Sequence, residues 1–497
     1  MFSTLSIGLA IDEIPSASEA EQLGLVIHWQ AQTERTQTGS GATGVVLWPH
    51  TKQRTEVITI RVGDRIVERI DANDIDLSAA EKLVLSPSGS SKSPRLGMEM
   101  ARKRAENTVS RYAKLGRTAV IEELNQPITY LIAASDNGAV RALNAETGEL
   151  FWSTTVGSSS YPTWGPGVND RFVTLANGMD LYVLDLMNGR VLTKKRLSES
   201  AAATAQPIGP LVYVPGINGT LTAYEGDDGK VEPITLRFTG SLTSPVVASR
   251  DERFVAWPSK NHLYVAQGGR KFVLWNRIES TSTFHAMPQL TSDGFVAVST
   301  NGMVYRINLN RLNNIVWREN LASQVVTPPL VTSGLVMVVS AIGDCFALDE
   351  KTGQVLWTSD LPDVKRVLAI TSKRIYAQRR AGQLVTFDRS TGKTLTSLNR
   401  EFATGIFNNV NDRVILQSPT GSLLCLREPE SINPVLNVPS SASSQVVKNE
   451  DGVKTPDAAI DMTANAGLGD SLFNEPPRSG GAAPAMSGDD PFAPPPN

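Results

Sequence analysis

Histidine, cysteine and acidic side chains could hold a metal or act in catalysis, but this chain arranges few of them in a recognisable way. Its 497 residues include two cysteines and four histidines, His28, His50, His262 and His285. No histidine has the spacing of a paired metal ligand, and neither H-E-x-x-H nor G-x-S-x-G occurs. Cys345 and Cys425 are interpreted as buried free thiols rather than as a functional pair.

Three short motifs resemble ligand-binding loops, and each has a simpler interpretation. Gly39–Gly44 matches G-x-G-x-x-G, but the strand-like Val45–Pro49 follows it, whereas a dinucleotide loop opens a helix. Gly392-Lys393-Thr394 lacks the earlier glycine of a phosphate loop. Asp71–Asp76 resembles a calcium loop, but Ile75 occupies a ligand position. We therefore expect turns here, with no metal and no cofactor.

The overall charge also narrows the class of protein. With 47 Lys and Arg against 50 Asp and Glu, the net charge is −3, which argues against a generally basic nucleic-acid-binding protein. The best apolar run, Leu335 to Ile342, is far shorter than the ~18 residues of a membrane helix, so we expect no transmembrane segment. Phe2–Ile11 lacks the positive charge and cleavage site of a secretory signal, which leaves open a cytoplasmic protein or a truncated start.

The elements that carry these residues repeat along the chain. From about residue 129, apolar strands alternate with short turns, and the pattern returns about every 40 residues. The first turn of each copy falls at Asn261 in the fourth copy and at a glycine in the others: Gly138, Gly178, Gly219, Gly302, Gly343, Gly382 and Gly421. A tight hairpin needs φ > 0 there, which these residues tolerate. The period predicts an all-β fold, an eight-bladed β-propeller of four-stranded blades.

A second turn and a tryptophan complete the repeat. Pairs such as Asp388–Gly392 place an acid four residues before a glycine, where the carboxylate can hold the turn. Four copies end in a tryptophan, namely Trp152, Trp275, Trp317 and Trp357. The segment Asp349–Trp357 reads D-x-x-T-G-x-x-x-W and resembles the tryptophan-docking repeat of pyrroloquinoline-quinone-type (quinoprotein-like) β-propellers. The resemblance covers about residues 129–430.

The eighth copy lacks an outer strand ending in tryptophan. Residues 23–30 alternate as a strand should and resemble the missing segment, so we predict that they close the ring with Trp29 as a docking residue. The predicted division is then residues 1–31, an N-terminal segment with the closing strand; 32–125, a small inserted α+β module; 126–430, the propeller; and 431–497, a Pro/Ser/Gly/Ala-rich acidic tail with a composition typical of disorder.

Two regions outside the repeats could bind partners. Residues 97–116 have the periodicity of a helix, and the basic side chains there include Arg102, Lys103 and Arg104. They could form an anion or partner surface, or simply a solvated helix face. In the tail, Phe473 and Phe492 each lie among acids and prolines. They are hypothesised anchors for a partner or for the basic helix, and the alternative is a solvated spacer.

The resemblance sets the functional expectations. The superfamily contains quinoprotein alcohol dehydrogenases and the non-enzymatic outer-membrane assembly factor BamB, and the BamB branch is the more similar in type. This implies a non-catalytic scaffold that binds other proteins in the periplasm or cell envelope. A quinone-dependent dehydrogenase is one alternative, although the chain lacks the adjacent cysteines of those enzymes. A peptide- or glycan-binding sensor that uses the central funnel is another, and the oligomeric state stays open.

Overall fold

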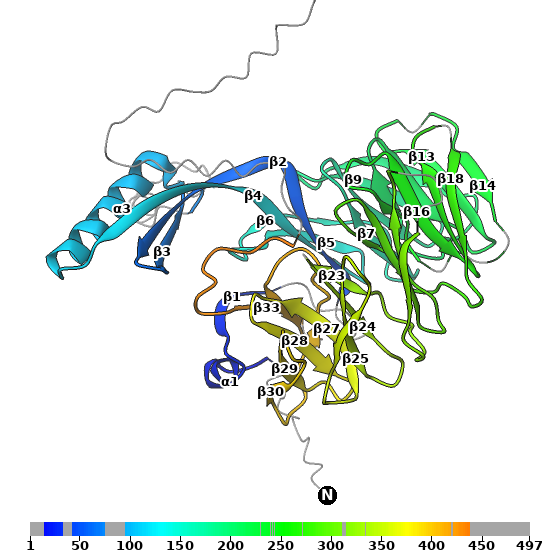
Figure 1. The fold of residues 1–497 in the computed structure, drawn as a ribbon. Helices are drawn as coiled ribbons and strands as arrows, with labels where there is room; N and C mark the ends of the chain where they lie inside the picture. Colours follow the sequence, from blue (N-terminus) through cyan, green and yellow to red (C-terminus); the bar gives the residue numbers. More distant parts are fainter. Residues whose placement is uncertain are drawn as a thin grey trace, which may run out of the picture. The chain divides into compact units, whose positions relative to one another are not determined.

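The computed structural model describes residues 14–32, 42–74 and 95–437, except for residues 229, 239, 241, 243, 271, 311–314, 333, 419 and 420. This part of the chain forms eight antiparallel sheets, which are the blades of an eight-bladed β-propeller (Figure 1). The fold class predicted from the repeat period is thereby confirmed. Within the described residues, neither helix combines the length and apolar character needed to cross a membrane.

Seven blades have four strands each, and their bounds follow in blade order. Blade 2 contains β7 (Thr163–Val168), β8 (Phe172–Asn177), β9 (Asp180–Asp185) and β10 (Val191–Arg196); blade 3 contains β11 (Gln206–Ile208), β12 (Leu211–Pro215), β13 (Thr220–Glu225) and β14 (Ile234–Arg237). Blade 4 contains β15 (Val247–Ala248), β16 (Phe254–Ser259), β17 (His262–Gln267) and β18 (Val273–Glu279); blade 5 contains β19 (Gln289–Leu290), β20 (Gly294–Val298), β21 (Met303–Asn308) and β22 (Ile315–Asn320). Blade 6 contains β23 (Leu330–Thr332), β24 (Leu335–Val339), β25 (Cys345–Asp349) and β26 (Val355–Thr358); blade 7 contains β27 (Val364–Ile370), β28 (Arg374–Arg379), β29 (Leu384–Asp388) and β30 (Thr394–Ser397). Blade 8 contains β31 (Thr404–Gly405), β32 (Val414–Gln417), β33 (Ser422–Arg427) and, as its outer strand, β1 (Val26–Gln32).

The core lies between neighbouring blades. The second strands are buried on both sides, as in β8, where all six residues are buried, because each blade is covered by the blades beside it. Ile132 and Ala142 of blade 1, for example, pack in one cluster with Val173 and Leu184 of blade 2. The outer strands alternate instead between exposed and covered positions, which is typical of a strand with one solvated side.

The ring has two faces, because antiparallel strands send alternate turns to opposite ends of each blade. We call the glycine-turn face the one with the turns between second and third strands. The seven glycines predicted for these turns have φ between 59° and 103°. In blade 4 the positive φ, 49°, belongs to Lys260 rather than to the predicted Asn261. The opposite face carries the Asp-x-x-x-Gly turns and the inserted module, and we call it the module face.

The module shares its strands with blade 1. β2 (Ala42–Val62) and β4 (Ala119–Ser135) pair along most of their length, and their inner halves form blade 1 with β5 (Ala139–Asn144) and β6 (Leu150–Thr155). Their outer halves carry β3 (Arg65–Asp71) and the helix α3 (Gly97–Lys114), which lie against this long ribbon (Figure 1). Residues 42–49, placed in the module by the sequence division, therefore belong to the innermost strand of blade 1.

The N-terminal segment joins the two ends of the described chain. Ser16 and Glu19 cap the short helix α1 (Ala17–Gln22) reciprocally, and Glu19 also pairs with Arg400 at 2.6 Å. After α1, the strand β1 pairs antiparallel with β33, from Val26 opposite Arg427 to Gln32 opposite Ser422. The outer strand of blade 8 thus begins three residues later than the predicted 23–30, and residues 23–25 lead into it.

Candidate functional site

The docking tryptophans join each blade to the next through one repeated hydrogen bond. The indole N–H of Trp29 donates to the carbonyl of Ala145 at 2.9 Å, and that of Trp152 donates to Leu186 at 2.7 Å. Trp317 and Trp357 make the same bond to the carbonyls of Glu350 and Arg389, at 2.9 and 3.0 Å. In all four cases the acceptor is the residue directly after the Asp or Asn that opens the second turn of the next blade.

The glycine of that turn lies under the indole ring. A Cβ added to Gly353 would stand 2.5 Å from the Trp317 ring, and one added to Gly392 would stand 2.2 Å from the Trp357 ring. Blade 2 lacks a tryptophan, but the Thr193 hydroxyl donates to the equivalent carbonyl, that of Gly226, at 2.6 Å. The acid and the glycine of each turn therefore serve the junction between blades.

Trp275 departs from this pattern. Its ring packs beside Phe254, with 5.3 Å between ring centroids, and its indole N–H finds no hydrogen-bond partner among the described residues. The blade that follows has no Asp-x-x-x-Gly turn, since its sequence there is Asn308-Leu-Asn-Arg-Leu. The tryptophan and the turn therefore depend on each other, and where the turn is missing the tryptophan serves packing alone.

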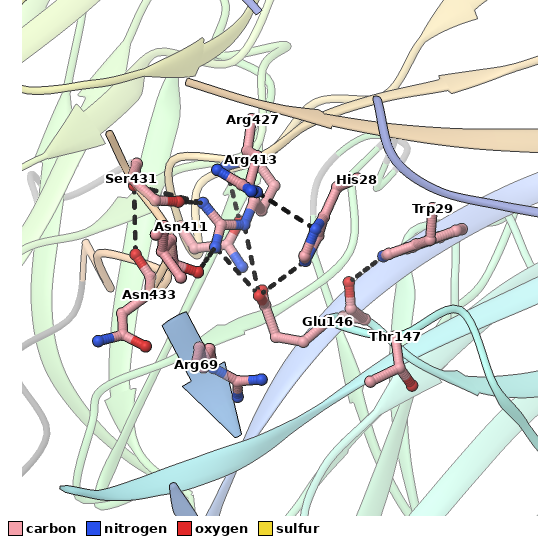
Figure 2. Close-up of polar contacts among 12 residues, drawn as sticks. His28, Trp29, Arg69, Glu146, Thr147, Asn411, Arg413, Arg427, Ser431 and Asn433 are labelled. Carbon is pink, nitrogen blue, oxygen red and sulfur yellow. Dashed lines mark hydrogen bonds and ion pairs between the residues drawn. The ribbon is translucent and has the colours of Figure 1, made fainter. Parts of the chain in front are cut away.

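A buried charge cluster lies where blade 8 meets blade 1 (Figure 2). The Arg413 side chain is fully buried, and its Nη2 lies 3.1 Å from Glu146 Oε2. The same guanidinium donates to the carbonyls of Ser431 and Ile432 at 2.9 and 3.0 Å. His28 Nε2 lies 3.5 Å from Glu146 Oε2. The cluster thus connects β1, the second turn of blade 1, blade 8 and the last described segment of the chain.

The electrostatics of this cluster favour the ionised carboxylate of Glu146. Burial alone would raise the pKa of Glu146, but the nearby charges of Arg413 and the contact with His28 lower it to about 2. At neighbouring Asp412, burial dominates and raises the pKa of the carboxyl. A buried ion pair of this kind specifies how the two blades meet, because either charge left alone would be costly.

The other side chains considered for chemistry are dispersed. Cys345 and Cys425 are buried in blades 6 and 8, and burial raises the pKa of the Cys345 thiol to about 12. Gly44, at the end of the G-x-G-x-x-G match, lies in β2 opposite Ala134. Asp71 accepts a hydrogen bond from the backbone N–H of Asn73 at 2.8 Å, as a polar turn does. Within the described residues, no three His, Cys, Asp or Glu side chains gather in a metal-binding group.

The centre of the ring is bridged on the module face. Asn409, in the turn after β31, donates from Nδ2 to Gln289 Oε1 of blade 5 at 2.9 Å. The backbone N–H of Asn408 donates to the Leu368 carbonyl of blade 7 at 3.0 Å. This turn of blade 8 therefore occupies the module-face end of the funnel.

The glycine-turn face carries exposed apolar side chains in two places. Tyr161 and Trp164 lie beside Gly178 in blade 2, and Ile217 lies in the equivalent turn of blade 3; we call these three the blade 2–3 cluster. Val326 and Ile342 lie at the entry and first turn of blade 6 and form the blade 6 cluster. The exposed fractions of these five residues run from 41% to 70%. Sequence reasoning missed both clusters, although their positions beside the repeated glycine turns could have shown them.

The predicted interaction residues of the module have different surroundings. Arg102 is paired with Glu123 of β4 at 2.7 Å, Lys103 is exposed, and Arg104 is half-buried. Phe473 and Phe492 lie outside the described residues. The exposed charge of α3 therefore rests on Lys103 and on residues farther along the helix.

Known proteins share the propeller part of this architecture. The chain matches the family model described as "Outer membrane protein assembly factor BamB" over residues 136–232 and 272–417, which leaves the module outside the match. BamB of Shewanella oneidensis is 24% identical over 330 residues, with 60% of this chain and 69% of that protein covered. BamB of Yersinia pestis is 19% identical over 290 residues, with 54% and 64% covered. The chain thus spans about two thirds of the length of these relatives.

Solved structures agree with the sequence comparison. The crystal structure of BamB from Moraxella catarrhalis has a TM-score of 0.51 and 18% sequence identity, with 60% of this chain and 91% of that chain covered. The eight four-stranded sheets and the tryptophan-docked turns fit this likeness. The chain is a pyrroloquinoline-quinone-type β-propeller repeat protein similar to the outer membrane protein assembly factor BamB.

Proposed function

We propose that the protein is a non-catalytic scaffold that binds other proteins in the bacterial cell envelope during assembly of outer-membrane proteins. The likeness to BamB supports the setting, and the exposed apolar clusters of the glycine-turn face support the binding role. The single observation that carries the proposal is the blade 2–3 cluster, where Tyr161, Trp164 and Ile217 stand exposed on a rigid frame.

The physical argument concerns what a scaffold needs. Tryptophan and tyrosine are enriched among the residues that dominate protein interfaces, because they bury a large apolar area at low entropic cost. Trp164 lies on β7 and pairs with Ala176 of β8, so its backbone is held before any partner arrives. The tryptophan docks between blades fix the spacing of the two clusters, which favours a partner with two matching contacts.

The buried groups, in contrast, serve the frame. The His28 ring lies between Arg427, whose Nε donates to Nδ1 at 3.3 Å, and the carboxylate of Glu146. Both cysteines are buried within blades. These contacts account for the nucleophilic and titratable side chains as parts of the packing, so the proposal assigns no reaction to them.

Affinity purification of the tagged full chain from cross-linked envelope fractions tests the proposal. The variants are Trp164→Arg and Ile342→Arg, one in each cluster. The matched control is Leu395→Arg, which changes an equally exposed side chain on the outer strand of blade 7. We expect either cluster variant, but not the control, to reduce recovery of outer-membrane assembly proteins at least about tenfold, since a central hot-spot residue is typically worth ~2 kcal/mol. Equal recovery with all three variants would contradict the proposal.

A further inference from the structure

The exposed side of α3 carries a line of basic side chains. Lys103, Asn107, Arg111 and Lys114 follow one another at intervals of about one turn and are all exposed; we call them the α3 ridge. Lys103, Arg111 and Lys114 form no ion pair with any described residue, whereas Arg102 on the adjacent side is paired with Glu123. The ridge is therefore a surface with uncompensated positive charge.

The C-terminal tail contains a segment with complementary chemistry. Residues 457–475 include the acids Asp457, Asp461, Asp470 and Glu475, and no lysine or arginine. The same segment contains several apolar side chains, among them Leu472 and Phe473. On the helix, Met100 is exposed about one turn before Lys103, so an apolar contact is available at one end of the ridge.

The last described residues leave the propeller beside the base of the module. The backbone N–H of Asn437 donates to the Val410 carbonyl at 2.8 Å, and Arg413 holds the carbonyls of Ser431 and Ile432 while pairing with Glu146 (Figure 2). Three residues after Glu146, Glu149 pairs with Arg95 at 2.7 Å, two residues before α3 begins. The tail and α3 therefore both start from the same turn of blade 1.

The length of the intervening chain suits an intramolecular contact. Residues 438–456 separate Asn437 from Asp457, and a flexible chain of that length has a root-mean-square span of about 24 Å. The 18 residues of α3 make a helix about 27 Å long. The segment 457–475 can thus reach any part of the ridge at a high effective concentration.

We propose that residues 457–475 of the tail dock on the α3 ridge of the same molecule. The acids contact Lys103, Arg111 and Lys114, and the apolar side chains contact Met100. Because the ridge is exposed, the contact is weakened by salt and can be displaced by an acidic partner that binds more tightly. The inference concerns the module and the tail, and it stands independently of the proposed function of the glycine-turn face.

Zero-length carbodiimide cross-linking of the full chain, read by mass spectrometry on the monomer fraction, tests this contact. Lys351 and Lys393 serve as internal controls, because they are exposed in turns of blades 6 and 7. We expect cross-links from residues 457–475 to Lys103 and Lys114 in at least about fivefold excess over those controls at low salt, and loss of the excess at 0.5 M NaCl.

A charge reversal sharpens the test. Arg111→Glu retains both reactive lysines of the ridge and should remove the excess, whereas Arg190→Glu, which reverses an exposed arginine in blade 2, should leave it unchanged. Equal cross-linking at all four lysines would overturn the proposal. So would cross-links found only between isotopically distinct copies in a mixed sample, which would indicate a second chain as the occupant.

A lipid surface is the remaining occupant of a basic ridge, and vesicles distinguish it. We expect the full chain to bind phosphatidylglycerol vesicles at least about fivefold more weakly than a variant with Asp457→Asn, Asp461→Asn, Asp470→Asn and Glu475→Gln, since the native tail covers the ridge. If both proteins bind the vesicles equally, and Arg111→Glu weakens both, the ridge is a membrane surface and the tail contact is refuted.

Discussion

Replacing Trp29 with alanine tests how the N-terminal strand closes the ring. The indole of Trp29 is buried between blades 8 and 1, its N–H donates to the Ala145 carbonyl at 2.9 Å, and its ring covers Gly148. Alanine would leave a cavity at this junction and a buried carbonyl without its donor. The strand β1 is the outer strand of blade 8 and follows the first described helix, so the loss falls on the joint between the two ends of the described chain.

The size of the effect follows from these contacts. Truncating a buried aromatic side chain to alanine typically costs ~3–5 kcal/mol, and the unmade hydrogen bond accounts for ~1 kcal/mol of this. We therefore expect Trp29→Ala to lower the free energy of unfolding by about 3–5 kcal/mol. Trp29→Phe keeps most of the ring contact but loses the donor, and should cost about 1–2 kcal/mol.

Urea unfolding followed by far-ultraviolet circular dichroism measures these differences without relying on tryptophan emission. The matched control is Trp275→Ala, because Trp275 is less buried and its N–H has no partner among the described residues. We expect the control to cost less than Trp29→Ala. If Trp29→Ala unfolds at the same urea concentration as the wild type, β1 does not stabilise the ring and the account of closure is wrong.

Three further predictions concern the junctions between blades. The pKa of Glu146 is lowered to about 2, so its ionised form contributes stability above pH ~4.5 that is lost as the pH falls through 2; the wild type should lose roughly 3 kcal/mol more than Glu146→Gln over that range in pH-dependent unfolding. Gly353→Ala, which forces a Cβ against Trp317, should lower the melting temperature more than Gly334→Ala, whose added Cβ meets no atom within 4 Å although both glycines have positive φ. Thr193→Val should cost about 1–3 kcal/mol in urea unfolding, because it leaves a buried carbonyl unpaired, whereas Thr193→Ser should cost less.

The repeat made the fold predictable from the sequence. The turn glycines and the Asp349–Trp357 segment recur at a fixed period, and each is required locally, by a positive φ in one case and by a docked ring in the other. The closing strand could be found for the same reason, since residues 23–30 resemble the outer strands of other blades. Local rules that repeat leave a signal in one sequence even without homologues.

Contacts between distant residues left no such signal. Glu146 and Arg413 are far apart along the chain, and nothing in their local sequence indicates that they pair. The module boundary was misplaced because β2 passes from blade 1 into the module without a turn residue to mark the change. The blade 2–3 cluster was missed because an exposed Tyr161 and a buried tyrosine look alike in sequence.

The most direct test of the central claim is site-specific photo-cross-linking in living cells. A photoreactive phenylalanine analogue placed at Tyr161 or Ile342 lies on the glycine-turn face, and one placed at Leu395 lies on the side of blade 7. The account predicts a discrete adduct with a component of outer-membrane protein assembly at the first two positions and none at the third. Equal adducts at all three positions, or adducts at Leu395 alone, would contradict a scaffold that binds through the glycine-turn face.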